Sequence, residues 1–205
     1  QIILITTQKE EDKIFLKIAK ENGILAFQGS EYDVLDRHYQ CAIQYDADPI
    51  LRITSDCPLI DPSLVEKMLE IFLKNNYDYV TNREPPTFPD GLDTEIIAFS
   101  TLKKIARYAK MSSEREHVTP YITKNPNKFK IYNYRNKKDL SHLRWTVDEK
   151  QDLAFVKKIY FQMRPKTLFS TNAVLKILVK NPSLLKINQG ILRNEGYAKS
   201  LKNDT

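Results

Sequence analysis

Cysteine is scarce in this 205-residue chain, which has only Cys41 and Cys57 and no CxxC spacing. A disulfide framework and a cysteine-ligated metal are therefore not expected, and a reducing, cytoplasmic setting fits. No apolar run reaches the roughly 18 residues that a membrane-spanning helix needs. We expect no secretory leader and no membrane partner.

Several motifs that identify enzymes by sequence are absent as well. The chain has no Walker loop, no GxGxxG, no HExxH and no serine–histidine–aspartate elbow. Their absence argues against P-loop hydrolases, dinucleotide-dependent dehydrogenases, zinc proteases and serine hydrolases. No internal repeat or low-complexity linker divides the chain.

The net charge is +6, from 32 basic and 26 acidic residues, and hydrophobic residues make up 41% of the chain. This composition is enough for a core and does not indicate disorder. The basic excess fits either a lysine-rich solvated surface or a site for polyanions such as nucleotide phosphates. We expect no nucleic-acid partner, because no basic block or RNA-binding motif is present.

Apolar runs typical of buried strands alternate with amphipathic helical patterns through the first 80 residues. Such alternation predicts an α/β fold with a mostly parallel sheet flanked by helices. Strands are expected at residues 2–6, 24–27, 50–53 and 77–80, and helices at 10–22, 33–43 and 64–75.

The pattern changes after residue 80. Strands are expected at 94–99, 129–134 (antiparallel or at a sheet edge) and 143–147, and helices at 100–110 with Ser100 as cap, 118–123, 152–163 and within 170–202. We interpret residues 1–165 as one α/β domain and residues 166–205 as a helical C-terminal extension.

Two of the expected strands end in an aspartate, in Thr54-Ser55-Asp56 and Thr146-Val147-Asp148. Ligands of open α/β sheets bind outside the carboxyl ends of the strands. Two carboxylates there form a hard-oxygen site that suits Mg²⁺. The plainer explanation of each aspartate is the N-cap of the next helix, which is a very common role, and the spacing leaves both alternatives open.

Other polar residues have two interpretations each. Arg37 can reach a phosphate, or Asp36 beside it can simply complement a helix dipole. Asp93 and Glu95 fall on one face of a strand, where they can bind sugar hydroxyls or form its solvated side. The segment holding Arg115, Glu116 and His117 lies between elements, where it can line a pocket or begin a helix.

Taken together, the motifs resemble the nucleotidyltransferases called spore coat polysaccharide biosynthesis protein F. The matching segments cover nearly the whole chain in order: Asp33-Val34-Leu35-Asp36-Arg37, Arg52-Ile53-Thr54-Ser55-Asp56-Cys57-Pro58-Leu59-Ile60-Asp61-Pro62, Pro89-Asp90-Gly91-Leu92-Asp93, Ser113-Glu114-Arg115-Glu116-His117-Val118-Thr119-Pro120-Tyr121, Leu143-Arg144-Trp145-Thr146-Val147-Asp148 and Arg193-Asn194-Glu195-Gly196-Tyr197. That family is similar to the cytidylyltransferases that activate 3-deoxy-manno-octulosonate and sialic acids.

The resemblance implies a Rossmann-like sheet of the nucleotide-diphospho-sugar transferase type and the transfer of CMP from CTP to a sugar, with release of pyrophosphate. It also implies Mg²⁺ as cofactor, a homodimer and a role in polysaccharide biosynthesis. The residue roles it implies are metal binding and catalysis by Asp56 and Asp148, nucleotide binding by Asp36, Arg37 and Arg52, and substrate binding by Asp93, Glu95, Arg115, Glu116 and His117.

One family motif has no match here. Related enzymes grip the nucleotide phosphates with a loop of the form Arg-x-x-Ser-x-Arg-Leu-Pro-x-Lys after their first strand, and this chain resembles them from their second strand onward. We therefore expect an N-terminally truncated domain with weak or no turnover as it stands. A catalytically impaired nucleotide- or sugar-binding module is the alternative function.

Overall fold

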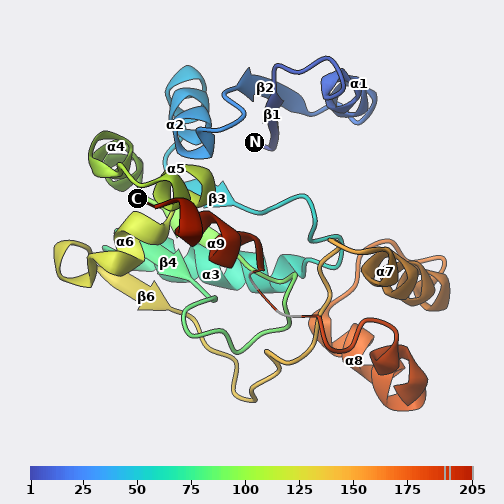
Figure 1. Cartoon of the computed structure of the whole chain (residues 1–205). Coiled ribbons are helices and arrows are strands. Elements are labelled where there is room, and N and C mark those ends of the chain that lie inside the picture. Colours follow the sequence, from blue (N-terminus) through green and yellow to red (C-terminus); the bar gives the residue numbers. More distant parts are fainter. Residues whose placement is uncertain (192, 194, 205) are drawn as a thin grey trace. The chain divides into compact units, whose positions relative to one another are not determined.

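A computed structural model describes residues 1–191, 193 and 195–204 of the chain (Figure 1). The strands are β1 (Ile3–Thr7), β2 (Leu25–Gly29), β3 (Ile50–Arg52), β4 (Tyr79–Thr81), β5 (Glu95–Ile97) and β6 (Ile131–Asn133). The helices are α1 (Lys13–Glu21), α2 (Val34–Gln44), α3 (Pro62–Lys74), α4 (Phe99–Tyr108), α5 (Ser112–His117), α6 (Pro120–Lys124), α7 (Lys150–Met163), α8 (Thr171–Lys180) and α9 (Glu195–Ser200).

The chain forms two compact units, each built from segments far apart in sequence. Unit 1 contains Gln1–Ile50, Ala98–Phe129 and Asn194–Thr205, and unit 2 contains Leu51–Ile97 and Lys130–Arg193. The sequence predicted a boundary between residues 165 and 166, which separates the α/β domain from the C-terminal extension. That boundary stays a prediction. Residues 192, 194 and 205 of the expected extension lie outside the described residues.

Unit 1 contains a parallel pair of strands, β1 and β2, in which Ile5 lies opposite Phe27. Helix α2 packs against β2, α4 and α5. Asp33 caps α2, because its carboxylate accepts a hydrogen bond from the Asp36 backbone N–H at 2.8 Å. The polar start of α2 is thus fixed beside α5.

The four-stranded sheet has the order β3-β5-β4-β6. Strand β4 pairs with β5 in antiparallel and with β6 in parallel orientation. The α/β class and the parallel pairing are confirmed, and the strand expected at 129–134 lies at the edge. Helix α3 begins at Pro62, where the Asp61 carboxylate accepts from the Ser63 backbone N–H at 3.0 Å.

Two local predictions were wrong. Residues 143–147 form no regular strand; they make only an isolated bridge, between Asp90 and Arg144, because they pair with the turn around residue 90. Ser100 does not cap α4, which begins at Phe99. The Phe99 backbone N–H donates instead to the Asp48 carboxylate at 3.0 Å, so a distant side chain satisfies the end of the helix.

The helical nature of the C-terminal part is confirmed by α8, α9 and short 3₁₀ turns. In α8, Val174 and Leu178 are buried. Both cysteines are free and buried. Within the described part of the chain, no helix combines the length and the apolar character needed to cross a membrane.

Candidate active site

The segments that carry Asp56 and Asp148 lie side by side in unit 2. The backbone carbonyl of Asp56 accepts a hydrogen bond from the Val147 backbone N–H at 2.9 Å and another from the Thr146 hydroxyl at 3.2 Å. Residues about 90 positions apart are thereby joined. Asp148 directly follows this junction, so the two carboxylates predicted as metal ligands leave neighbouring stretches of backbone.

Neither aspartate is the cap that the competing interpretation required. Helix α3 is capped by Asp61, and the N-cap of α7 is Glu149. The helix-cap alternative is therefore wrong for both residues. The Asp148 side chain is 53% exposed and Asp56 is half-buried, so both are accessible to a ligand.

The Asp56 carboxylate has a weak neutral neighbour. The Cys57 thiol donates to Asp56 Oδ1 at 3.3 Å, and Cys57 Sγ lies 3.2 Å from the Thr54 hydroxyl. Burial raises the pKa of Cys57 far above its usual value, so the thiol keeps its proton. Since a thiol is a poor donor, the Asp56 oxygens remain good ligands for a harder cation.

The donor set fits Mg²⁺ bound in part by substrate. Across residues 1–191, 193 and 195–204, no three histidine, cysteine, aspartate or glutamate side chains are arranged as a metal cage. Mg²⁺ usually keeps several waters and uses only one or two carboxylates together with substrate phosphates. Asp56 and Asp148 are two carboxylates of the kind that this mode of binding requires.

Arg144 and Asp152 hold the turn that carries Asp148. The Arg144 guanidinium donates to Asp148 Oδ2 at 2.5 Å, to both oxygens of Asp152 at 2.9 and 3.0 Å, and to Asp90 Oδ2 at 3.2 Å. Asp152, fully buried, also accepts from the backbone N–H groups of Asp148 and Glu149. The position of Asp148 therefore depends on a buried ion pair.

Burial acts to raise the pKa of Asp152, but hydrogen bonds from Arg144 and Asn188 outweigh it and hold the pKa below its usual value. Sequence reasoning missed Asp152. The available signal was its place three residues after Glu149, where an acid completes a capping box at the start of α7.

A second group of charges surrounds the loop at residues 89–93. Arg193 pairs with the Asp93 carboxylate, and its Nε lies 3.6 Å from Asp90 Oδ1. Burial raises the pKa of Asp90, against the opposing effect of Arg193. Arg83 Nε lies 3.9 Å from Asp93 Oδ2, which links this loop to the interior of the sheet.

Arg52 and Glu95, predicted to bind nucleotide and substrate respectively, bind each other. Arg52 and the Tyr79 hydroxyl both donate to the Glu95 carboxylate, and Arg83 Nη1 lies 3.6 Å away. Burial, together with Glu95, raises the pKa of Tyr79, so the phenol keeps its proton. Glu95 is only 2% exposed, so the alternative of a solvated strand face is wrong for it.

The remaining predicted residues lie in unit 1. Arg37 donates to the Ser30 carbonyl at 2.9 Å, and Asp36 accepts from Gln40 at 3.1 Å. Arg115 donates to the Asp33 carboxylate, with Nε at 2.9 Å, and so ties α5 to the cap of α2.

Glu116 and His117 both contact Ser200 of α9. The Ser200 hydroxyl donates to Glu116 Oε2 at 2.6 Å, and His117 Nε2 lies 2.9 Å from the same hydroxyl oxygen. The structure thus groups Asp36, Arg37, Arg115, Glu116 and His117 in one unit, and Arg52, Asp56, Asp93, Glu95 and Asp148 in the other.

Gly91 allows the loop at residues 89–93 to approach the junction. Its φ is +100°, and a Cβ at this position would lie 2.5 Å from the Thr146 backbone N. We expect Gly91→Ala to lower the free energy of unfolding by about 2–4 kcal/mol, through backbone strain and a clash with backbone that cannot yield.

Gly190→Ala is the matched control for that substitution. Gly190 also has a positive φ, +88°, but no atom lies within 4 Å of its added Cβ. Its loss should be about 1 kcal/mol, from backbone strain alone. Equal losses in urea unfolding of the two variants would show that the close approach at Gly91 contributes nothing.

The chain is similar to several known proteins. The profile of the family described as "Cytidylyltransferase" matches residues 1–183. An uncharacterized protein of Methanocaldococcus jannaschii is 37% identical over 201 residues, which cover 96% of this chain and 79% of that protein. Spore coat polysaccharide biosynthesis protein SpsF of Bacillus subtilis is 27% identical over 186 residues, covering 88% and 75%.

Solved structures are similar too. A cytidylyltransferase of Leptospira borgpetersenii superposes with a TM-score of 0.88 at 35% identity, covering 93% of this chain and 80% of that one. Molybdopterin-guanine dinucleotide biosynthesis protein A of Archaeoglobus fulgidus gives a TM-score of 0.52 at 13% identity, with coverage of 78% and 79%. The second similarity concerns the fold alone.

Proposed function

Because the chain belongs to the cytidylyltransferase family, and is thus a nucleotidyltransferase with a Rossmann-like fold, we propose that it transfers CMP from CTP to a sugar or sugar acid and releases pyrophosphate. The similarity to the Bacillus protein supports an acceptor used in polysaccharide biosynthesis. A cytoplasmic location is also proposed. A homodimer is part of the same proposal.

The observation that carries this proposal is the junction between the segments of Asp56 and Asp148. The Asp56 carbonyl is bonded to Val147, and neither aspartate side chain is used to cap a helix. Two carboxylates that leave adjacent backbone, and that the helices do not need, are suited to bind a cation beside a triphosphate.

In the proposed reaction, an oxygen of the acceptor attacks the α-phosphorus of CTP, and the bond to the pyrophosphate breaks. Asp56 and Asp148 would hold Mg²⁺, which supplies neutralisation of the charge on the phosphates. Arg144 and Asp152 orient Asp148, since they fix both its carboxylate and its backbone N–H. Catalysis of this kind consists mainly of positioning and electrostatic stabilisation.

The other assignments stay part of the proposal. Asp36, Arg37 and Arg52 serve the nucleotide, and Asp93, Glu95, Arg115, Glu116 and His117 serve the sugar. The internal contacts described above favour an indirect role for several of them. Arg52, for example, donates a hydrogen bond to the Glu95 carboxylate, so each orients the other.

The test is a screen for pyrophosphate release. The protein is incubated with Mg²⁺, each of the four ribonucleoside triphosphates and a panel of sugars, sugar acids and sugar phosphates. We expect slow release, only with CTP and a specific class of acceptor, and none with the other three triphosphates. Binding of CTP without release for any acceptor would contradict the transferase and support a nucleotide-binding module. Release without any acceptor would identify a hydrolase instead.

A further inference from the structure

Residues 150–191 of unit 2 carry a strong excess of exposed basic side chains. The stretch contains one acid, Asp152, which is fully buried and paired with Arg144. It also contains eight basic residues, all exposed: Lys150, Lys157, Lys158, Arg164, Lys166, Lys176, Lys180 and Lys186. We call these eight residues the basic face. Asp148 and Glu149 precede it, at the end of α7 remote from the α7–α8 connection.

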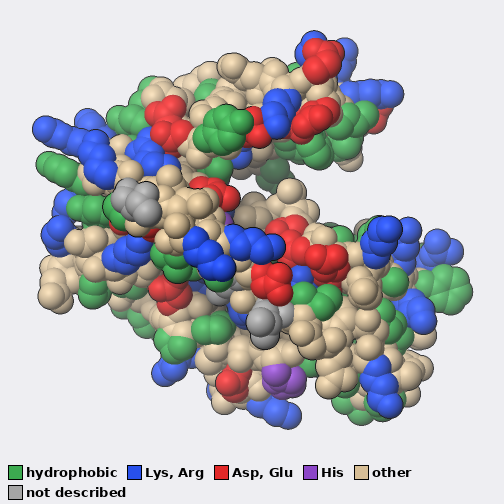
Figure 2. All heavy atoms as spheres, viewed as in Figure 1, with side chains coloured by type: hydrophobic (Ala, Val, Ile, Leu, Met, Phe, Trp, Pro, Cys, Tyr) green, Lys and Arg blue, Asp and Glu red, His purple; other side chains and the backbone are tan. Residues whose placement is uncertain are grey.

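Large apolar side chains are exposed on the same elements. Phe161 is 68% exposed, Leu168 75% and Val179 80%. On α7, Leu153, Lys157 and Phe161 follow one another at intervals of four residues, so they share one side of the helix. Basic and hydrophobic side chains interleave over α7 and α8 at the right of Figure 2.

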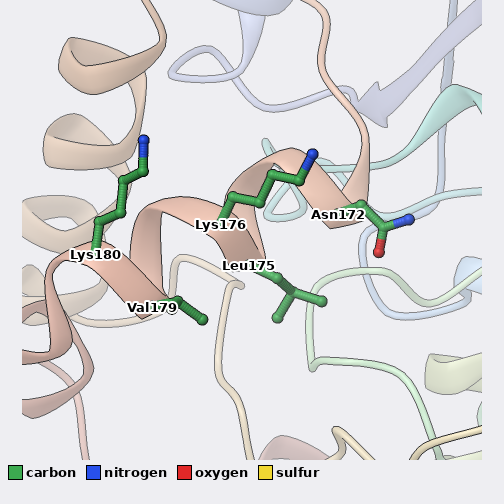
Figure 3. A pocket seen from close by; sticks show the side chains of 5 residues that line it. All are labelled: Asn172, Leu175, Lys176, Val179 and Lys180. Carbon is green, nitrogen blue, oxygen red and sulfur yellow. The ribbon is translucent and has the colours of Figure 1, made fainter.

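Helix α8 has a buried side and an exposed side. Its buried residues are Val174 and Leu178. The opposite side carries a depression lined by α8 alone, with Leu175 and Val179 directed to one side and Lys176 and Lys180 to the other (Figure 3). Val179 therefore lies away from the buried side of α8.

We infer that the basic face docks on an anionic lipid surface, with Phe161, Leu168 and Val179 entering the headgroup region. Charge complementarity and exposed apolar side chains both fit this partner. Lysine and arginine are attracted to anionic headgroups, while aromatic and aliphatic side chains gain by leaving water at the bilayer interface. Arg164, whose guanidinium lies 5.5 Å from the Phe161 ring centroid, joins the two features at the end of α7.

Two other partners fit less well. Nucleic acid would satisfy the lysines, but of the three exposed apolar residues only Phe161 can stack on a base, and Leu168 and Val179 would stay in water. In a two-fold symmetric dimer through this face, the eight positive charges of one copy would lie against the eight positive charges of the other. Such like-charge contact is unfavourable.

The inference changes the expectation of no membrane partner. That expectation came from the lack of a membrane-spanning run, and peripheral binding requires none. It does not depend on the proposed reaction, because no residue of the basic face belongs to the candidate site.

Co-sedimentation with lipid vesicles tests the inference. The whole chain is mixed with vesicles of phosphatidylcholine alone, or of phosphatidylcholine with about one third phosphatidylglycerol. We expect partitioning only onto the anionic vesicles, weakened by added salt. Lys176→Glu with Lys180→Glu should lower it at least about 25-fold, since each lysine near such a surface contributes about fivefold. Phe161→Ala should lower it about fivefold.

The control is Lys17→Glu with Lys20→Glu on α1, which makes the same charge change on exposed helical positions of the other unit. It should lose less than twofold. All changed positions are exposed, and circular dichroism checks that each variant is folded.

Three results would overturn the inference. One is an equal loss in the control and in the α8 lysine variant, which would mean a nonspecific charge effect. Another is unchanged partitioning of Phe161→Ala, which would indicate a site for soluble polyanions. The third is a pair of results: the wild type does not bind vesicles, and the α8 lysine variant has a different oligomeric state by light scattering. Together they would identify a second copy as the partner.

Discussion

Asp56→Asn should abolish most metal-dependent nucleotidyl transfer and leave the fold intact. We expect a fall in kcat/KM on the order of 10²- to 10³-fold, because a hard anionic ligand worth several kcal/mol in the transition state is lost. The fold should persist, since the backbone carbonyl of Asp56, not its carboxylate, holds the junction with Val147. Steady-state pyrophosphate release and thermal unfolding measure the two effects.

The matched control is Asp139→Asn, an exposed aspartate of the same unit whose carboxylate accepts a hydrogen bond from the Ser141 backbone N–H at 2.9 Å. It should leave turnover within about twofold of wild type, as distant surface changes usually do. Normal turnover by Asp56→Asn would contradict the assignment of the metal site, whatever the control shows.

Arg144→Met should cause the largest loss of stability, about 3–5 kcal/mol. Arg144 is the common partner of Asp90, Asp148 and Asp152, and it is itself only 9% exposed. Its removal leaves the fully buried Asp152 without a cation, which costs more than the ion pair contributes. The measurement is the free energy of unfolding in urea.

Arg135→Met is the control for this substitution, because Arg135 is exposed in the same unit. Its effect should stay within about 0.5 kcal/mol. If the two variants unfold at the same urea concentration, the network around Asp152 does not hold the turn that carries Asp148.

The sequence was sufficient for the features that local chemistry determines. The alternation of strands and helices predicted the α/β class. The caps of α2 and α3 are equally local, because the Asp33 and Asp61 carboxylates accept from backbone N–H groups two or three residues away. The expected strand at 143–147 failed for the opposite reason. Its apolar pattern is real, but its partner is a turn around Asp90, more than 50 residues away, and no local pattern encodes that pairing.

The candidate site was predictable only in part for the same reason. Asp56 and Asp148 stood out because each follows an apolar run. Asp152 did not stand out, since its role depends on contacts with Arg144 and with Asn188, which lies 36 positions later. Glu95 was expected to face substrate, but its contacts with Arg52 and Tyr79 depend on how the strands pair, which residue spacing does not reveal.

The central claim is that Asp56 and Asp148 together hold one cation beside a nucleotide. The most direct measurement is electron paramagnetic resonance of Mn²⁺, which prefers the same oxygen ligands as Mg²⁺, titrated with the wild type, Asp56→Asn and Asp148→Asn in the presence of CTP. We predict one CTP-dependent Mn²⁺ site in the wild type. The affinity of this site for Mn²⁺ should fall at least about tenfold in each single variant. Because both aspartates serve one site, the loss in the double variant should be smaller than the product of the two single losses. Mn²⁺ and CTP binding unchanged in both single variants would contradict the account.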